Sequence, residues 1–235
     1  MKLAVMQPYV FPYFGYIQLI NSVDKFVLLD NVNYFKGGYI NRNNILVNDD
    51  KYMFTMPLSG ASQNKFIRDI KICDNKWDTK FIKTIKSAYK KAPFYDDTIT
   101  LLNNIFNKDV VYLSEFVYIS LSEICNYLDI DTTLIEHCDR YENDNLKGQE
   151  KIIDICIKEN ADTYINPIGA LDLKLYDSDL FDRNDMTMFF IKMGDVKYEQ
   201  FNNKFISNLS IIDLLMFNSK NELKFMLENY ELIRN

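Results

Sequence analysis

The sequence lacks a long uninterrupted apolar run. No stretch approaches the roughly 18 uncharged apolar residues that a membrane-spanning helix needs. The first residues, Met1 to Pro8, also lack the long apolar segment and the small-residue cleavage site of a signal peptide. We therefore expect a cytoplasmic protein with no membrane partner.

Cysteine and histidine are scarce. The four cysteines, Cys73, Cys125, Cys138 and Cys156, include no CxxC pair, and the chain is long enough to fold without covalent links. We expect neither disulfides nor structural zinc. Because His137 is the only histidine, we expect no metal-ligand cluster, although a few carboxylates could hold Mg²⁺ on a phosphate.

Linker signals are also missing. The chain has 7 glycines and 5 prolines, and no repeat, low-complexity tract or Gly/Ser-rich stretch divides it. With 235 residues, 48% of them hydrophobic, it can bury one sizeable core. We expect a single domain over residues 1–235, with a helical segment near residues 75–130 as a candidate subdomain. The net charge of −6 argues against a nucleic-acid partner, which would repel the protein.

The apolar pattern predicts an α/β fold. Lys2–Met6 and Lys25–Asp30 are short apolar runs typical of buried strands, and Gly15–Ile20 between them has helical spacing. A strand, a loop, a helix and a second strand predict a parallel sheet with a site at its C-terminal edge. The other predicted strands are the hairpin Ile45–Asn48 with Lys51–Leu58, then Ile67–Cys73, Thr132–His137 and Thr163–Ile165, and an alternating segment spans Met186–Met193. The other predicted helices are Trp77–Lys91, Pro93–Asn107, Val110–Leu128, Gly148–Glu159, Leu209–Phe217 and Lys220–Leu232.

The loop after the first strand is rich in aromatic residues. It contains two prolines, one glycine and at least four aromatic rings where the strand ends, and it leads into a helix N-terminus that could receive an anion. A rigid aromatic plug over the core is the competing interpretation. The candidate binding residues here are Gln7, Tyr9, Phe11 and Gly15, and Tyr13 and Tyr16 are the candidate catalytic residues.

This loop also carries a resemblance to a known family. Met6–Ile20, Asp30–Tyr34 and Gly38–Asn43, together with Lys147–Glu150, Asp162–Gly169 and Asn208–Asp213, resemble the WbqC-like family across nearly the whole chain. That family is associated with bacterial O-antigen and other surface-glycan gene clusters. The resemblance therefore implies a role in surface-glycan, or lipopolysaccharide, biosynthesis.

A second resemblance concerns the position of the turn at Phe11–Tyr16. It lies where nucleotidylyltransferases and pantothenate-synthetase-like ligases carry an HxGH signature, between the first strand and the first helix. Tyrosines stand in place of the histidines, and a neutral tyrosine donates only one O–H hydrogen bond. The similarity implies a Rossmann-like core related to those folds, while the missing histidines count against adenylyl transfer.

The segment after the second strand could form another wall of the same cleft. Arg42 lies between two asparagines and could hold a diphosphate or carboxylate, while Tyr34 or Tyr39 could stack on a base or sugar. A Gly-Gly turn with solvated charges is the competing interpretation. The candidate binding residues are Asn33, Tyr34, Lys36, Tyr39, Asn41, Arg42 and Asn43.

Two later segments add candidate binding residues. Lys147, Gly148 and Gln149 begin a predicted helix, whose N-terminus could receive an anion. Asn166 ends a predicted strand and could orient a sugar or nucleoside, although Asn-Pro followed by glycine is also an ordinary turn sequence.

Asp30 is the preferred carboxylate for general-base work, because it lies at the tip of the second strand. A nucleophilic pair of His137 and Cys138 is not the leading hypothesis, since adjacent strand residues point to opposite faces. Asp213 is a weaker candidate, because near Ser210 a helix-capping role is simpler.

The leading functional hypothesis is transfer of an acyl or aminoacyl group to the amine of a nucleotide-linked amino sugar. ATP with Mg²⁺ or an activated acyl donor would be the co-substrate, and an oligomer is compatible with the sequence. Two alternatives stay open: a nucleotidylyltransferase that uses ATP or CTP with Mg²⁺, and a sugar-nucleotide-binding scaffold without enzymatic activity.

Overall fold

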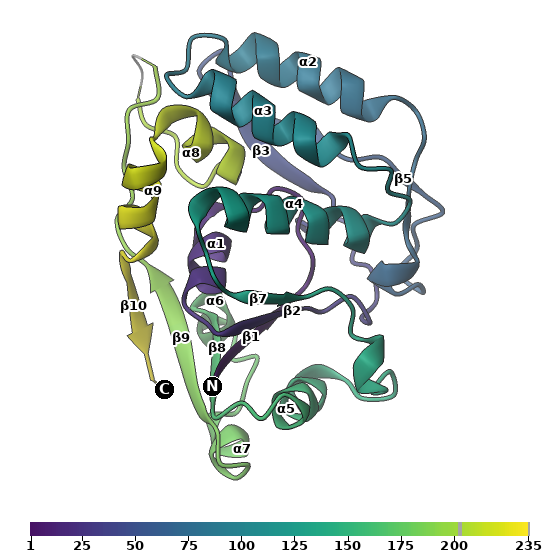
Figure 1. Cartoon of the computed structure of the whole chain (residues 1–235). Helices are drawn as coiled ribbons and strands as arrows, with labels where there is room; N and C mark the ends of the chain where they lie inside the picture. Colours follow the sequence, from purple (N-terminus) through teal and green to yellow (C-terminus); the bar gives the residue numbers. More distant parts are fainter. Residues whose placement is uncertain (202–203, 235) are drawn as a thin grey trace.

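The computed structural model describes residues 1–201 and 204–234. Its central sheet has the strand order β10-β9-β8-β1-β2-β7 (Figure 1). If the six strands are numbered 1 to 6 along the chain and read from the β7 edge, their order is 3-2-1-4-5-6. This is the doubly wound order of a Rossmann-like core. The strands are β1 (Lys2–Met6), β2 (Lys25–Leu28), β7 (Thr133–Ile135), β8 (Thr163–Pro167), β9 (Thr187–Met193) and β10 (Tyr230–Ile233).

Helices cover both faces of this sheet (Figure 1). Alternate side chains of β1 enter different cores: Ala4 belongs to one buried cluster, and Leu3 and Val5 belong to the other. The first cluster includes α1 (Phe14–Asn21), α4 (Leu113–Leu128), α8 (Ile211–Phe217) and α9 (Lys220–Leu227). The second includes α5 (Gly148–Lys158), α6 (Gly169–Asp172) and α7 (Ser178–Asp182). The α/β prediction is confirmed.

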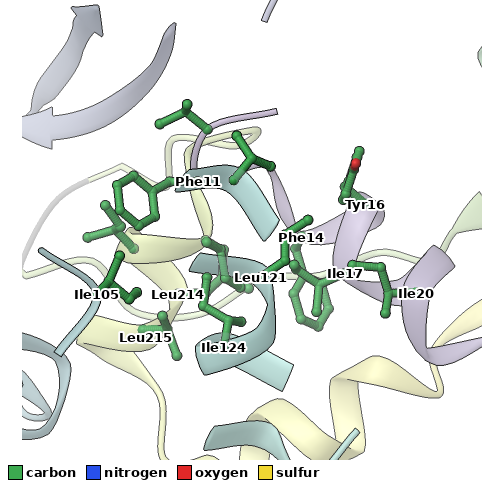
Figure 2. Packing of buried hydrophobic residues seen from close by; sticks show 14 of the residues in the cluster. Phe11, Phe14, Tyr16, Ile17, Ile20, Ile105, Leu121, Ile124, Leu214 and Leu215 are labelled. Atoms are coloured by element: carbon green, nitrogen blue, oxygen red, sulfur yellow. The ribbon is translucent and has the colours of Figure 1, made fainter. Parts of the chain in front are cut away.

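The first cluster extends beyond the sheet into an outer layer. This layer contains the predicted hairpin, β3 (Arg42–Val47) with β4 (Asp50–Thr55), and the helices α2 (Trp77–Tyr89) and α3 (Tyr95–Phe106). Figure 2 shows Phe11 of the β1 loop near Ile105 of α3 and Leu215 of α8. The helical segment near residues 75–130 therefore shares its core with the α/β layers.

The predicted strand Ile67–Cys73 is wrong in its first half. Ile67–Asp69 forms the short 3₁₀ helix η1, and only Lys71–Ile72 (β6) is extended, paired with β5 (Leu58–Ser59). The backbone N–H of Arg68 donates to Asp30 O at 3.0 Å, and that of Ile67 donates to Val32 O at 3.0 Å. These bonds anchor η1 to the segment after β2.

The end of the chain corrects two further predictions. The expected helix Lys220–Leu232 stops at Leu227, and Tyr230–Ile233 forms β10 antiparallel to β9. The sheet is therefore mixed rather than wholly parallel. The backbone groups along the outer edge of β9 need partners, and pairing with β10 satisfies them.

The remaining predicted helices and strands are found, with ends shifted by a few residues, and η2 (Asp139–Tyr141) follows β7. Within the described ranges, none of the helices combines the length and the apolar character that a bilayer crossing requires.

Asp213 is a buried structural carboxylate. It is fully buried in α8 and accepts hydrogen bonds from the Tyr89 hydroxyl at 2.7 Å, the Tyr198 hydroxyl at 2.6 Å and Gln200 Nε2 at 2.7 Å. Burial raises the pKa of Asp213, although these hydrogen bonds oppose the rise. Ser210 caps α8 by accepting from Ile212 N, so the helix-capping interpretation of Ser210 is confirmed.

Replacing Asp213 by alanine is expected to lower the free energy of unfolding by about 3 kcal/mol, because three donors lose their acceptor inside the protein. Urea unfolding measures this loss. Asp109→Ala, which removes an exposed carboxylate, is the matched control and is expected to change stability by less than about 0.5 kcal/mol. Equal losses in the two variants would contradict the structural role of Asp213.

Candidate active site

The loop after β1 gathers tyrosines at the point where the strand order reverses between β1 and β8. Tyr16 is fully buried, and its hydroxyl donates to Gln7 O at 2.9 Å. The Tyr9 ring lies 5.6 Å from the Tyr16 ring. Burial raises the pKa of Tyr9, Tyr13 and Tyr16, so all three are neutral hydroxyls at pH 7. The Tyr16 hydroxyl already donates to a backbone carbonyl, whereas the Tyr13 side chain is half-buried and partly open to solvent.

Phe11 and its neighbours organise this loop from inside the core. Phe11 is 1% exposed and has a left-handed backbone (φ 42°), and its carbonyl oxygen accepts from Asn43 Nδ2 at 2.7 Å and Ser210 Oγ at 2.8 Å. The Tyr13 ring lies against Gly15, where a Cβ atom would collide with it. Phe11, Gly15 and Asn43 therefore hold the loop in place and present no side chain to solvent.

The segment after β2 lies beside the hairpin. The buried Tyr34 hydroxyl donates to Asn41 Oδ1 at 3.0 Å, and Asn41 Nδ2 donates to Met56 O at 2.7 Å. The Arg42 guanidinium donates to the carbonyl oxygens of Gly37 and Gly38, so it braces the Gly-Gly turn. Three of the predicted residues here are exposed, namely Asn33, Lys36 and Tyr39, and Arg42 is half-buried.

Of the two later segments, the one at Lys147–Gln149 contacts the start of α7, and Asn166 lies in β8. Gln149 exchanges two hydrogen bonds with the Asp177 backbone, at 2.6 and 2.9 Å. Asn166 is buried, and its Nδ2 donates to the Tyr164 hydroxyl at 2.6 Å and to the Tyr176 hydroxyl at 3.4 Å. The other two predicted residues, Lys147 and Gly148, are exposed.

Asp30 pairs with a residue that the sequence analysis left outside the site. Asp30 is fully buried after β2, and its Oδ2 lies 2.8 Å from His137 Nδ1, after the neighbouring strand β7. The Cys138 backbone N–H donates to Asp30 Oδ1 at 3.0 Å, which fixes the carboxylate. His137 Nε2 faces Glu136 Oε1 at 3.5 Å. Asp30 thus orients a half-exposed imidazole at the C-terminal edge of the sheet.

Cys138 is no nucleophile in this arrangement. Its side chain is fully buried, its Sγ donates to Leu28 O at 3.2 Å, and burial raises its pKa to about 12. The thiol therefore stays protonated at neutral pH. His137 points instead to Asp30, which agrees with the rejection of a His137–Cys138 nucleophile pair.

A cluster of hydrogen-bonded polar residues lies beside the Asp30–His137 pair, on the side of α5. Arg68 of η1 contacts both carboxylate oxygens of Asp144, at 3.3 and 2.5 Å. Asn31 Nδ2 donates to Asn143 Oδ1 at 2.9 Å and to Asp144 Oδ1 at 3.0 Å. Lys151, only 2% exposed, donates to Asn31 O at 2.9 Å, and burial lowers its pKa. These contacts fix Asn31, the residue that follows Asp30.

The environment of His137 favours its charged form. Partial burial lowers its pKa, but the hydrogen bond and charge of Asp30, with Glu136 and Asp139 nearby, outweigh this and raise the pKa above 6.5. Burial raises the pKa of Asp30 despite hydrogen bonds from Cys138 and His137. A histidine imidazole can accept a proton from a substrate and return it.

His137 borders two hollows. One, of about 460 Å³, lies against η1 and the start of α4, and we call it the His137 hollow. The other, of about 340 Å³, runs along β7, where Lys25 pairs with Glu159 at 2.7 Å. A substrate in either hollow would contact the imidazole, so the arrangement can perform general acid–base catalysis.

The predicted residues therefore fall into separate groups. Among the described residues, no hydrogen bond or ion pair links Tyr13, Asp30, Arg42 and Asn166. The sequence analysis did not select His137, Arg68, Asp144 or Lys151. For His137 a signal existed, because it is the last residue of a predicted strand as Asp30 is; the other three carry no local pattern that marks them.

The doubly wound sheet and the Asp30–His137 pair at its C-terminal edge define an α/β protein with a candidate acid–base centre. The chain belongs to the WbqC-like protein family, whose sequence model matches residues 7–225. The family identification made from the motifs is thus confirmed.

A relative has also been found by sequence. It is the "Uncharacterized protein Rv1507c" of Mycobacterium tuberculosis, which is 28% identical over 217 residues, covering 91% of this chain and 92% of the relative. No solved structure matches the chain.

Proposed function

We propose that this protein is an enzyme of surface-glycan biosynthesis that transfers an acyl or aminoacyl group to the amine of a nucleotide-linked amino sugar. The association of the WbqC-like family with O-antigen gene clusters supports the pathway. The Asp30–His137 pair is the observation that carries the chemistry, since amide formation needs a base to remove the amine proton.

In the proposed reaction the amine nitrogen attacks the carbonyl carbon of an activated acyl donor. A nitrogen–carbon bond forms, and the bond between that carbon and the donor's leaving group breaks. His137 Nε2 accepts the amine proton and passes it to the leaving group, while Asp30 holds Nδ1 and stabilises the imidazolium. Asp30 thus acts through His137, in place of the direct base that the sequence analysis assigned to it.

The nucleotide half of the substrate would bind along the segment after β2. Lys36 and Tyr39 are exposed there and could contact phosphate and base, beside the Arg42-braced turn. We also propose that the fold is related to those of nucleotidylyltransferases and pantothenate-synthetase-like ligases. The position of the aromatic loop, between β1 and α1, supports this relation. Tyr13 lines a different hollow, with Phe14, Met193 and Tyr198, so we assign it no step at His137.

A ligand thermal-shift experiment tests this proposal, because a ligand that binds the native state raises the melting temperature. Purified protein is heated with nucleotide-linked amino sugars, ATP, CTP and acyl donors, each with and without Mg²⁺. We expect a nucleotide-linked amino sugar at about 100 Kd to stabilise the protein by about 2.7 kcal/mol, which raises the melting temperature by about 5–10 °C.

Other outcomes would overturn the proposal. Stabilisation only by ATP or CTP with Mg²⁺ would favour nucleotidylyl transfer. Binding of a sugar nucleotide with no turnover in the presence of acyl donors, and no effect of Asp30→Asn on pathway output, would favour a scaffold.

A further inference from the structure

The His137 hollow carries an excess of negative charge. Its lining includes four carboxylates, from Asp69 of η1, Glu115 of α4, and Glu136 and Asp139 on either side of His137. Arg68 is the lining residue with a fixed positive charge, and its guanidinium already contacts both oxygens of Asp144. Within the part of the chain that the structure describes, Asp69, Glu115 and Asp139 have no ion-pair partner, and Glu136 faces His137. A cation entering this hollow therefore meets unneutralised carboxylates, whereas an anion is repelled.

A buried hydroxyl in the same hollow lacks a partner. Ser114, the second residue of α4, lines the hollow and is fully buried. Its Oγ has no hydrogen-bond partner within the part of the chain that the structure describes. Buried polar atoms are nearly always paired, so an unpaired one beside a reactive imidazole points to a ligand that supplies the missing hydrogen bond.

We propose that the His137 hollow binds the substrate amine as an ammonium ion, with carboxylates and Ser114 Oγ as its acceptors, before His137 removes a proton from it. An ammonium has three N–H donors and no acceptor, which matches a lining of carboxylates and a hydroxyl oxygen. A hydroxyl or N-acetyl group at the same sugar position has no charge, so the hollow selects free amino sugars.

The position of His137 explains how the bound cation becomes a nucleophile. Its Nδ1 is held by Asp30, so Nε2 is the nitrogen left for the substrate, and Glu136 Oε1 lies 3.5 Å from it. Ammonium held by Glu136 is therefore brought to Nε2. One N–H bond of the ammonium breaks, an N–H bond forms at neutral Nε2, and the substrate keeps the electron pair as a free amine. The half-exposed imidazolium then releases this proton to solvent, so Nε2 is again free to accept the second proton when the amine attacks the acyl donor.

This inference rests on the proposed function, but its test needs no turnover. His137 is the only histidine, so its imidazole C2 proton gives a single reporter signal in a proton NMR spectrum. The full-length protein is titrated at about pH 7 with glucosamine, which carries a titrating amine, and in parallel with N-acetylglucosamine. We expect glucosamine to shift the signal with saturation, and N-acetylglucosamine to leave it unchanged.

Variants then locate the bound cation. Glu115→Gln and Glu136→Gln are each expected to weaken glucosamine binding about three- to tenfold, an effect that higher salt mimics. Glu231→Gln makes the same change on β10, at the opposite edge of the sheet from β7, and should leave binding unchanged. Ser114→Ala should weaken binding without lowering the melting temperature, because it removes an unpaired hydroxyl.

Equal shifts with both sugars, or loss of binding in Glu231→Gln as large as in Glu136→Gln, would overturn the inference. So would a Ser114→Ala variant that binds glucosamine like the native protein. If amine binding behaves as expected but no acyl transfer is found with any donor, the proposed function fails while the ammonium site stands.

Discussion

His137→Gln is expected to lower kcat of the proposed acyl transfer by about 100- to 10,000-fold, which is the usual contribution of a positioned general base. Glutamine keeps a polar side chain at this position but cannot accept and return a proton near neutral pH. The measurement is steady-state kinetics with the nucleotide-linked amino sugar that the thermal-shift panel identifies. KM for that sugar should change much less than kcat, because His137 acts on the proton transfer.

The stability of the variant separates catalysis from folding. The imidazole is half-exposed, so His137→Gln should leave the melting temperature close to that of the native protein. Tyr112→Phe, which alters another lining residue of the His137 hollow, is the kinetic control and should keep kcat within about threefold. Native kcat in His137→Gln would remove His137 from the mechanism.

Phe11→Ala is expected to cost about 3–5 kcal/mol of unfolding free energy, the range found when a buried phenylalanine leaves a cavity. Phe11 is 1% exposed, and its ring lies between 5.9 and 6.4 Å from four other phenylalanine rings. Those rings are Phe54 of β4, Phe81 of α2, Phe106 of α3 and Phe116 of α4. One side chain thus joins the β1 loop to β4, α2 and α3 of the outer layer and to α4.

Guanidinium unfolding followed by the fluorescence of Trp77, the only tryptophan, measures this loss, since its ring stacks on Phe81 at 4.7 Å. Phe225→Ala removes the same side chain from a position that is 82% exposed, and it should change stability by less than about 0.5 kcal/mol. A loss below about 1 kcal/mol in Phe11→Ala would show that the loop is not anchored through this ring.

Local patterns were sufficient to predict most of the sheet and its helices. Lys2–Met6 and Lys25–Leu28 are short apolar runs that can be buried on both faces, and α2, α3 and α4 have clear helical spacing. Tyr230–Ile233 could not be separated from the preceding helix in this way, because the strand exists only through pairing with β9. η1 likewise depends on backbone bonds to residues near Asp30.

The site was harder to predict than the fold, because its contacts join distant parts of the chain. Asp30 was selected for its place at a strand end, but its partner His137 lies 107 positions later, and Arg68 meets Asp144 across 76 positions. Phe11 is the opposite kind of error. Its place in a strand-to-helix loop suggested a binding residue, but its ring is buried in the core. Sequence position identified the edge of the sheet but not which side chains face solvent there.

The titration of His137 by proton NMR tests the central claim most directly, because this claim is that Asp30 orients and charges the imidazole. The account predicts that the pKa of His137 is raised above its ordinary value in the native protein and is lower in Asp30→Asn, where the carboxylate charge is gone and partial burial still disfavours the cation. The same His137 pKa in both proteins would contradict it.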